Sequence, residues 1–268
     1  MRPKTILCFD FGGTSTKAAL KFDNQYILKK LPNQEEPNVL INKVLCDFKS
    51  YNIDKIIITG SKTEGIDFNK ISIDTIKLDE LEAVANIVRF LNIDKGLVVN
   101  IGTGTSFTLY DKGKHYHISG TGLGGGTFLG LSQRLLNTTD LETIKELACC
   151  GDITKVNVNV SEICNKDIGW LSKDITASNF GKLQGEKEDV ACGIHSLVAE
   201  SITAMIKGIT YNTHVNSIIL CGGLIENSLV RQLISRNLEI FDLQHKFLDN
   251  PRFGTCLGAI TLFQLLSA

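Results

Sequence analysis

Apolar and polar positions follow two periods along this chain, one typical of strands and one typical of helices. Residues 5–10 (TILCFD) form a short apolar run that predicts a buried strand. Two glycines follow, and residues 16–22 (TKAALKF) predict a second strand. We therefore expect a hairpin near the N-terminus, with its turn at Gly12 and Gly13.

A similar unit recurs in residues 96–119 (GLVVNIGTGTSFTLYDKGKHYHIS). It reads as an apolar strand, a loop GTGTS, a second strand to Tyr110, a turn at 111–113 and a third strand. Each half of the chain thus begins with a strand, a loop of Gly and Thr, and another strand. This pattern indicates an internal duplication.

Helices and strands alternate elsewhere, which predicts an α/β protein. Residues 79–92 (DELEAVANIVRFLN) carry apolar side chains on one helical face. Further helices are predicted at 37–52, 127–137, 140–148, 187–208, 228–237 and 254–266, and further strands at 55–60 and 217–223. We place a boundary near Asp94–Gly96, which predicts two lobes, 1–94 and 95–268.

Composition narrows the classes of partner. The chain has 268 residues, 43% of them hydrophobic, and a net charge of -1, so no basic field favours nucleic acid or an anionic membrane. The eight cysteines form no CxxC pair, which indicates reduced thiols. No apolar stretch approaches the roughly 20 residues of a membrane span, so we expect a cytoplasmic protein with a small-molecule partner.

The first turn has the chemistry of a phosphate site. Its glycines present backbone N–H groups without Cβ interference, and its hydroxyls and lysine add donors. Asp10 ends the strand and is suited to hold a hydrated Mg²⁺, which prefers few carboxylates plus phosphate oxygens. The candidate phosphate-binding residues of this turn are Gly12, Gly13, Thr14, Ser15, Thr16 and Lys17.

Two later segments repeat this chemistry. The loop NIGTGTS contains Gly102, Thr103 and Gly104, and SGTGLGGGTFLGL places three glycines before an apolar helix. Free N–H groups at a helix N-terminus attract anions. The segment LCGGLIENSLV adds a strand, a Gly–Gly pair and a helix, so several turns with anion-binding chemistry occur in one chain.

These motifs carry a resemblance. DFGGTSTK, NIGTGTS and CGG, in this order, resemble the phosphate and adenosine elements of the actin-like sugar kinase and acetate kinase superfamily. NIGTGTSF, GTGLGGGTFLGL, CGDITKV and DITASNFGK are similar to the type II pantothenate kinases over nearly the whole chain. The resemblance implies two actin-like (ribonuclease H-like) lobes around a nucleotide cleft.

The resemblance also implies ATP-dependent phosphorylation of pantothenate, the first step to coenzyme A, by a homodimer that uses Mg²⁺ and that coenzyme A or its thioesters regulate. Residues 10–17 and 102–104 would contact ATP, with Gly223 near the adenosine. Gly125, Gly126 and Thr127 would join them. His117 and Gly122 would lie beside the substrate.

The family's catalytic base is a Glu in a short acidic-apolar-acidic motif, which ELEA matches here at Glu80. The residues supply a second reason for this choice. Asp79 and Glu82 have the spacing of a capping box, which gives both acids a structural role and leaves Glu80 free. Taken alone, Glu80 also fits a first-turn acid favoured by the helix dipole.

One position departs from the family. Its members usually have an Arg shortly before the Gly-rich segment, and that residue helps to hold the substrate carboxylate. His117 stands at the matching place, and an imidazole lacks the two-pronged donor geometry of a guanidinium. The ATP assignment is therefore better supported by the residues than the pantothenate assignment.

Three other functions remain open at this point. One is a different kinase of the same superfamily, acting on an amino sugar or a hexose. Another is a nucleotide- or acyl-CoA-binding homologue with weak catalysis. The third is an ATPase that activates a metalloenzyme, which would need cysteines that ligate an iron–sulfur cluster.

Overall fold

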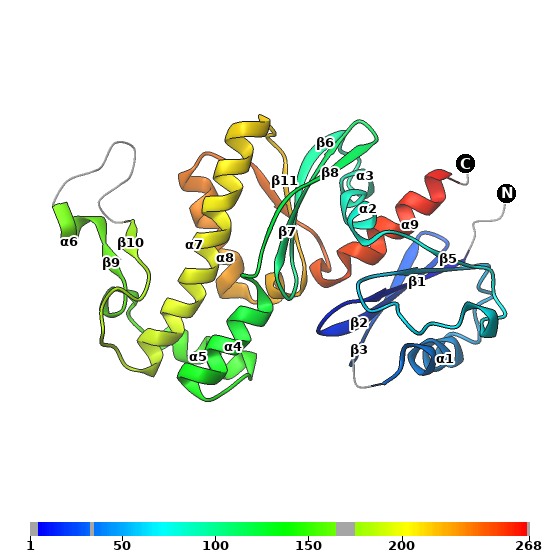
Figure 1. Ribbon diagram of the computed structural model, residues 1–268, viewed down its shortest axis with the longest axis horizontal. Helices are drawn as coiled ribbons and strands as arrows, with labels where there is room; N and C mark the ends of the chain where they lie inside the picture. The colour runs from blue at the N-terminus through cyan, green and yellow to red at the C-terminus, as the bar shows by residue number, and fades with distance from the viewer. Residues whose placement is uncertain (1–4, 33–34, 165–174, 267–268) are drawn as a thin grey trace. The chain divides into compact units, whose positions relative to one another are not determined.

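The computed structural model describes residues 5–32, 35–164 and 175–266 (Figure 1). Strands and helices alternate through these ranges, so the predicted α/β class is confirmed. The chain forms two compact units, each continuous in space but not in sequence. The first unit comprises Met1–Thr121, Val215–Gly223 and His245–Ala268, and the second comprises Gly122–His214 and Leu224–Gln244.

The first unit begins with a five-stranded sheet in the order β3-β2-β1-β4-β5. The predicted N-terminal hairpin is confirmed as the antiparallel pair β1–β2, whereas the sequence did not indicate β3. The strands are β1 (Ile6–Phe11), β2 (Ser15–Phe22), β3 (Gln25–Pro32), β4 (Lys55–Thr59) and β5 (Thr75–Lys77). The short 3₁₀ helix η1 spans Phe68–Lys70.

Residues of β1 alternate between two apolar layers, as the period of two in a strand requires. Leu7, Phe9 and Phe11 pack with helix α1 (Pro37–Asp47) on one face. Ile6 and Cys8 pack on the other face with Ala83 and with the C-terminal helix α9 (Gly254–Leu266). Asp10 has the parity of the second set, which directs it to the face that holds α9.

The second sheet of this unit repeats the topology of the first. Its order is β12-β11-β6-β7-β8, and its antiparallel and parallel pairings match those of β5-β4-β1-β2-β3 in turn. The predicted internal duplication is therefore confirmed. The strands are β6 (Lys95–Ile101), β7 (Thr105–Asp111), β8 (Lys114–Thr121), β11 (Ile218–Cys221) and β12 (His245–Phe247).

The helix predicted at 79–92 is two helices, α2 (Glu80–Ala85) and α3 (Ile87–Phe90), so the prediction of one continuous helix was wrong. The interruption falls at buried Asn86, whose side-chain Nδ2 donates to the Glu82 carbonyl at 2.9 Å. An Asn side chain that bonds nearby backbone groups competes with regular helix formation. Both short helices pack against α9, which fixes their positions.

The predicted lobe boundary at 94/95 falls between the two sheets, because every strand of the first sheet precedes it and every strand of the second follows it. The compact units divide the chain elsewhere, since α9 comes from the C-terminal end yet packs on β1, α2 and α3. The division into lobes 1–94 and 95–268 stays a prediction.

The second unit is mainly helical, and its helices α4, α5 and α8 all contact the long helix α7. By length and composition α7 alone, among the described helices, could cross a membrane. It is mostly buried, and the core helix of a globular protein passes the same test. The helices are α4 (Gly125–Leu136), α5 (Leu141–Cys150), α6 (Val160–Cys164), α7 (Lys187–Thr213) and α8 (Ser228–Ile240).

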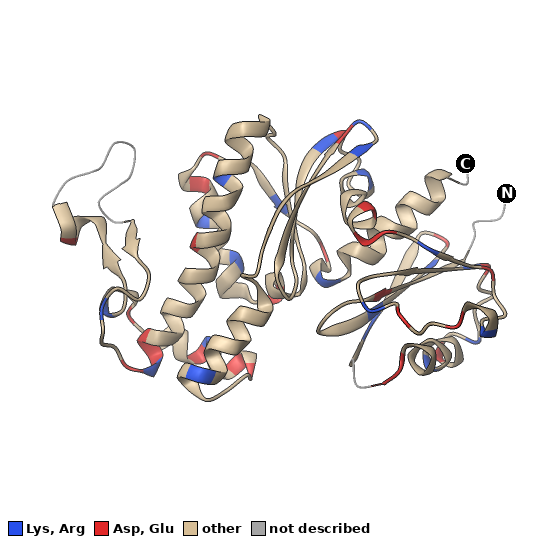
Figure 2. Cartoon of the chain, in the orientation of Figure 1, with Lys and Arg blue, Asp and Glu red and all other residues tan. Residues whose placement is uncertain are grey.

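The remaining elements of the chain are short. A two-stranded sheet pairs β9 (Val158–Asn159) with β10 (Thr176–Ser178). The other 3₁₀ helices are η2 (Ile153–Lys155), η3 (Gly223–Glu226) and η4 (Pro251–Phe253). Figure 2 shows basic and acidic residues interspersed along the elements of each unit.

Candidate active site

A cavity of about 280 Å³ in the first unit brings together most of the sequence-predicted site residues. It lies where β1, β4, β6 and β11 end, so loops distant in sequence contribute to one wall. The carboxyl ends of parallel strands are a common position for ligand sites in α/β proteins. The predicted residues that line it are Asp10, Gly12, Gly13, Lys17, Glu80, Gly102, Thr103, Gly104 and Gly223.

The β1–β2 turn positions an ion pair in this cavity. The antiparallel register sets Asp10 opposite Lys17, and Lys17 Nζ lies 3.2 Å from Asp10 Oδ2. A Cβ on Gly12 would lie 2.6 Å from Lys17 Nζ, so glycine leaves room for the ammonium group. The sequence DFGGTSTK thus places one carboxylate and one cation side by side at the strand end.

Asp10 is only 4% exposed, and its Oδ1 atom has no hydrogen-bond partner among the residues that the structure describes. Burial raises the pKa of this carboxyl, while the charge of Lys17 and its hydrogen bond act in the opposite direction. Gly60 has φ +101°, and a Cβ there would lie 2.7 Å from Asp10 Oδ1. A buried carboxylate oxygen without a partner fits a group that binds a hydrated cation.

Glu80 enters the cavity from the first turn of α2. Asp79 is the N-cap of this helix, since its Oδ1 accepts from the Glu82 N–H at 3.0 Å. Among the described hydrogen bonds, Glu82 does not return the second bond of the predicted capping box. Asp79 nevertheless has the structural role that the sequence predicted, and Glu80 is left to face the cavity.

The pKa of the Glu80 carboxyl is raised, mainly by burial and then by the negative charge of Asp10. Lys17 lowers this pKa and Asp79 raises it slightly further. A carboxylate with a raised pKa is a stronger base than an exposed one. Two acids and one lysine therefore form a coupled group in the cavity, as is common at catalytic sites.

The β6–β7 loop forms the second side of the cavity. Thr103 Oγ1 lies 2.8 Å from Thr14 Oγ1, which links this loop to the β1–β2 turn. A Cβ on Gly13 would lie 3.0 Å from Thr103 Oγ1, so the two loops approach closely. The two loops that the resemblance assigns to ATP thus contact each other in the first unit.

Six further residues line the cavity, and three of them, Asn100, Ser106 and Gly222, belong to the motifs NIGTGTS and CGG. Gly222, with φ +100°, lies so near β6 that a Cβ would be 2.3 Å from the Ile101 carbonyl oxygen. Arg252 lies beside Gly223, where a Cβ would be 3.2 Å from Arg252 Nη1. The repeated Gly–Gly signal in LCGG indicated this corner, whereas nothing in the sequence marked Arg252. The six are Ser61, Asn100, Ser106, Gly222, Arg252 and Thr255.

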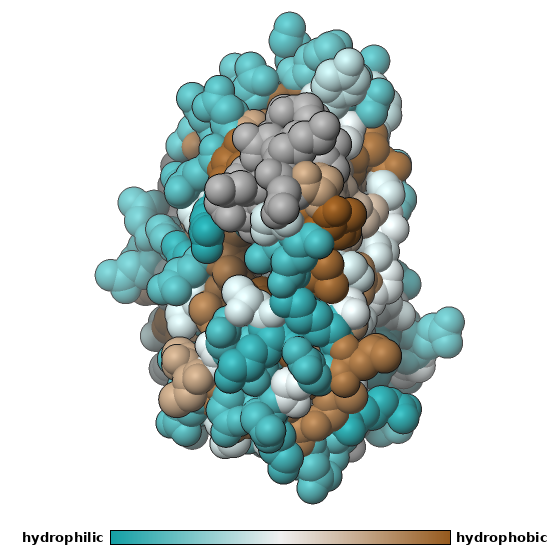
Figure 3. Space-filling view, turned by 90° about the vertical axis from the view of Figure 1, so that its left-hand side faces the viewer, coloured by the Kyte–Doolittle hydropathy of each residue, from teal (hydrophilic) through white to brown (hydrophobic). Residues whose placement is uncertain are grey.

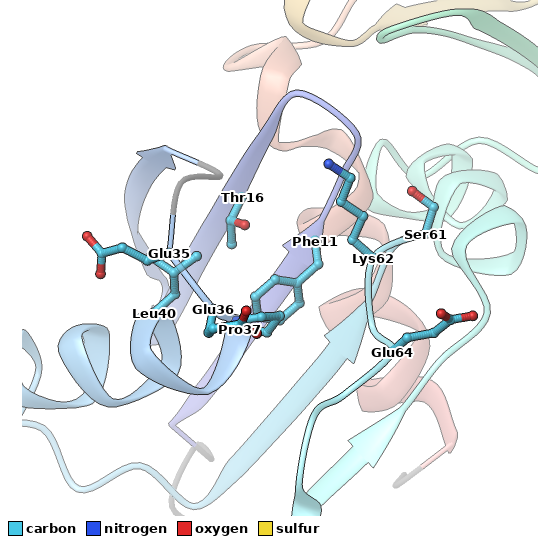
Figure 4. Close-up of a pocket in the computed structure, with 9 residues that line it drawn as sticks. All are labelled: Phe11, Thr16, Glu35, Glu36, Pro37, Leu40, Ser61, Lys62 and Glu64. Carbon is cyan, nitrogen blue, oxygen red and sulfur yellow. The ribbon is translucent and has the colours of Figure 1, made fainter.

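Three predicted residues of the first turn do not line this cavity. Thr14 is exposed and pairs with Thr103, while Ser15 is buried in β2. Thr16 is also buried and lines a second cavity of about 490 Å³ (Figure 4). Ser61, which follows β4, lines both cavities, so they share part of a wall there.

Comparison with known proteins decides the family. A profile described as Fumble matches residues 95–262. A type II pantothenate kinase of Bacillus anthracis is 30% identical over 272 residues, covering 96% of this chain and 97% of the relative. This chain belongs to the type II pantothenate kinase family. The relative of that name from Oceanobacillus iheyensis is 27% identical, with 94% of this chain and 97% of its own length covered.

Solved structures with low sequence identity share the fold of this pantothenate kinase family member. An activator of 2-hydroxyisocaproyl-CoA dehydratase from Clostridium difficile, with bound ADPNP, has a TM-score of 0.64 at 17% identity, with 98% of both chains covered. A ROK family glucokinase from Streptomyces griseus, in complex with glucose and AMPPNP, has a TM-score of 0.63 at 12% identity, covering 96% and 98%. These likenesses extend over nearly the whole chain and bear out the predicted fold.

In this pantothenate kinase family member, the residue at the place of the usual family Arg lies on an exposed edge strand. His117 is exposed in β8, next to a register shift in the β7–β8 pairing, and does not line either described cavity. Helix α2 contacts β7 and β8, so the helix that carries Glu80 lies against this edge of the sheet. The substrate role of His117 stays a prediction.

The family's Gly-rich segment opens the second unit. Gly125 begins α4, and Thr127 Oγ1 donates to the Gly122 carbonyl at 2.7 Å. This bond shapes the turn before the helix, where N–H groups lack helical partners. Contacts of Gly122, Gly125, Gly126 and Thr127 with ligands stay predictions.

The cysteines of this pantothenate kinase family member are free thiols. Among the described residues, no group of three or more His, Cys, Asp or Glu side chains could hold a metal ion. A site with one protein carboxylate is compatible with Mg²⁺, which keeps waters and phosphate oxygens as its other ligands.

Proposed function

We propose that this protein transfers the γ-phosphoryl group of ATP to the primary hydroxyl of pantothenate, giving 4'-phosphopantothenate for coenzyme A synthesis. One observation carries the proposal: Glu80, the Asp10–Lys17 pair and three glycine turns line the same cavity. The family of the chain supports pantothenate as the acceptor.

In this mechanism Glu80 accepts the hydroxyl proton as the phosphoryl group transfers. Its raised pKa favours this role, because a general base works best when its pKa approaches the operating pH. Such a base typically contributes about 10²–10⁴ in rate. Positioning and charge neutralisation supply most of the remaining catalysis.

The phosphates of ATP are assigned to the two paired loops. Backbone N–H groups at Gly12, Gly13 and Gly102–Gly104 would donate to phosphate oxygens, with Lys17 as the cation and the Thr103 hydroxyl as a further donor. Arg252 and Gly223 would lie near the adenosine. Gly125, Gly126 and Thr127 at the start of α4 would complete the nucleotide contacts.

We assign Mg²⁺ to Asp10, whose buried Oδ1 supports this role because no described residue forms a hydrogen bond with it. Bound Mg²⁺ would neutralise charge that develops on the transferring phosphoryl group. Lys17 holds the second carboxylate oxygen and so orients the side chain of Asp10. On the substrate side, His117 and Gly122 are assigned to pantothenate.

The same proposal includes a cytoplasmic homodimer that coenzyme A or its thioesters regulate. The second unit exposes several large apolar side chains, which a second copy of the chain would cover. Figure 3 shows apolar groups among hydrophilic ones on one face of the molecule. The exposed residues of this unit include Leu135, Leu141, Ile163 and Leu183.

The experiment is a transfer assay with γ-labelled ATP, Mg²⁺ and separate acceptors: pantothenate, pantetheine, N-acetylglucosamine and glucose. The proposal expects labelled product from pantothenate and none from either sugar. Product from a sugar alone would assign the chain to another kinase function. Nucleotide binding without product from any acceptor would favour the weakly catalytic homologue instead.

A further inference from the structure

The loop after β4 brings a second lysine to the β1–β2 turn. Lys62 Nζ donates to the Gly13 carbonyl at 2.9 Å, although 49 residues separate the two in sequence. In Figure 4 the Lys62 side chain extends toward this turn, whereas Glu64 points away from it. The ammonium group therefore lies beside the loop assigned to the phosphates.

A backbone hydrogen bond positions Lys62 beside the end of β1. The Lys62 N–H donates to the Phe11 carbonyl at 2.9 Å, which ties the loop to the end of β1. Gly60 has φ +101°, and a Cβ there would lie 2.6 Å from the same carbonyl oxygen. The side chain of Lys62 thus starts from a point close to Asp10 and the Gly12–Gly13 turn.

The two lysines at this turn differ in their charge balance. Lys17 is ion-paired with Asp10, so its charge is largely compensated within the protein. None of the ion pairs found among the described residues includes Lys62, whose described partner is a neutral carbonyl. An ammonium group has three N–H donors, so the bond to Gly13 leaves two for an anion.

From this placement we infer that Lys62 binds the terminal phosphate of the nucleotide and positions it for transfer. The inference deepens the proposed function and rests on it. The ammonium group donates to a γ-phosphoryl oxygen and offsets charge that grows there during transfer, while the Gly13 carbonyl holds it at the turn. Lys62 lines the second cavity, and Ser61, the residue before it, lines both, so Lys62 lies next to the cavity assigned to the phosphates.

The test compares the binding of AMPPNP and ADP, each with Mg²⁺, by titration calorimetry. Lys62→Gln keeps a donor for the Gly13 carbonyl and removes the charge. We expect about tenfold weaker AMPPNP binding, the order of a lost charge-assisted hydrogen bond, with ADP affinity within about twofold of wild type. Lys62→Arg restores the charge and should recover most of the AMPPNP affinity.

Lys70→Gln is the matched control. Lys70 also follows β4, is largely exposed and pairs with Asp67 at 3.3 Å, so its removal changes the net charge equally without touching the turn. Both nucleotides should bind this variant as they bind wild type. Thermal unfolding of each variant establishes that it is folded.

Three results for Lys62→Gln would overturn the inference while leaving the kinase proposal intact. The first is unchanged AMPPNP binding, and the second is an equal weakening of ADP and AMPPNP binding. The third is a raised KM for pantothenate with unchanged nucleotide affinity. The second would reduce Lys62 to a support for the loop, and the third would assign it to the substrate carboxylate. Wild-type protein that binds neither nucleotide would overturn the proposed function as well.

Discussion

The contact between α2 and α9 gives a sharp prediction, because it positions Glu80 from a distance. Gly258 of α9 approaches α2 so closely that a Cβ there would lie 2.0 Å from the Ala83 carbonyl oxygen. It would also lie 3.1 Å from the Ile87 nitrogen. Real Cβ atoms essentially never come within 3.0 Å of such atoms, so Gly258→Ala must separate the two helices.

The required separation is about 1 Å, and it displaces the short helix whose first residue is Glu80. Overpacking of this kind typically costs about 1–3 kcal/mol of folding free energy. A 1 Å misplacement of a catalytic group costs on the order of 10² in rate. We therefore expect Gly258→Ala to lose about a hundredfold in kcat, although residue 258 is not among those that line the cavity.

Steady-state kinetics with pantothenate and ATP, together with urea unfolding, measure both effects. Gly208→Ala is the matched control, since Gly208 lies in α7 and a Cβ there meets nothing within 4 Å. That change should leave kcat unaltered and raise stability by about 0.5–1 kcal/mol, the helix preference of Ala over Gly. Wild-type kcat and stability in Gly258→Ala would refute the close packing and its link to Glu80.

Two further predictions concern protonation. Glu80 must be deprotonated to act as a base, and burial raises its pKa. The acid limb of the pH profile of kcat/KM should therefore lie above pH 4.5, the usual pKa of Glu. An acid limb at or below pH 4.5 would contradict the assignment of Glu80 as the base. In the second unit, burial lowers the pKa of His195, whose Nε2 lies 3.2 Å from Asn227 Nδ2. The unfolded chain then binds a proton first, so stability should fall as pH drops below about 6.5 toward the lowered pKa of the folded state. Urea midpoints across this range should vary less in His195→Gln; an equal pH dependence in both proteins would exclude His195 as the cause.

Local signals predicted much of the fold. An apolar run that ends in Asp–Phe–Gly–Gly allows few structures besides a buried strand and a tight turn. The same order of strand, Gly-containing loop and strand around NIGTGTS indicated the duplication. Asp79 indicated a helix start because an N-cap side chain bonds a backbone N–H only two or three residues further along the chain. Each of these features depends on contacts within a few residues.

Long-range contacts explain what the sequence did not reveal. Arg252 and Thr255 reach the cavity because α9 returns to pack on β1, a contact that spans almost the whole chain. The interruption at Asn86 depends on whether an amide side chain turns back to its own helix or elsewhere, and sequence periodicity carries no such information. The motif places His117 at the position of the usual family Arg. Its side chain is exposed because β8 is an edge strand, which the motif does not indicate.

The central claim is that the cavity of the first unit holds ATP's phosphates while Glu80 removes the proton of the acceptor. Single-turnover transfer from γ-labelled ATP to pantothenate, with wild type and Glu80→Gln, tests it most directly. The variant should bind AMPPNP with wild-type affinity and transfer the label about 10²–10⁴ times more slowly. Transfer at the wild-type rate by Glu80→Gln would contradict the account.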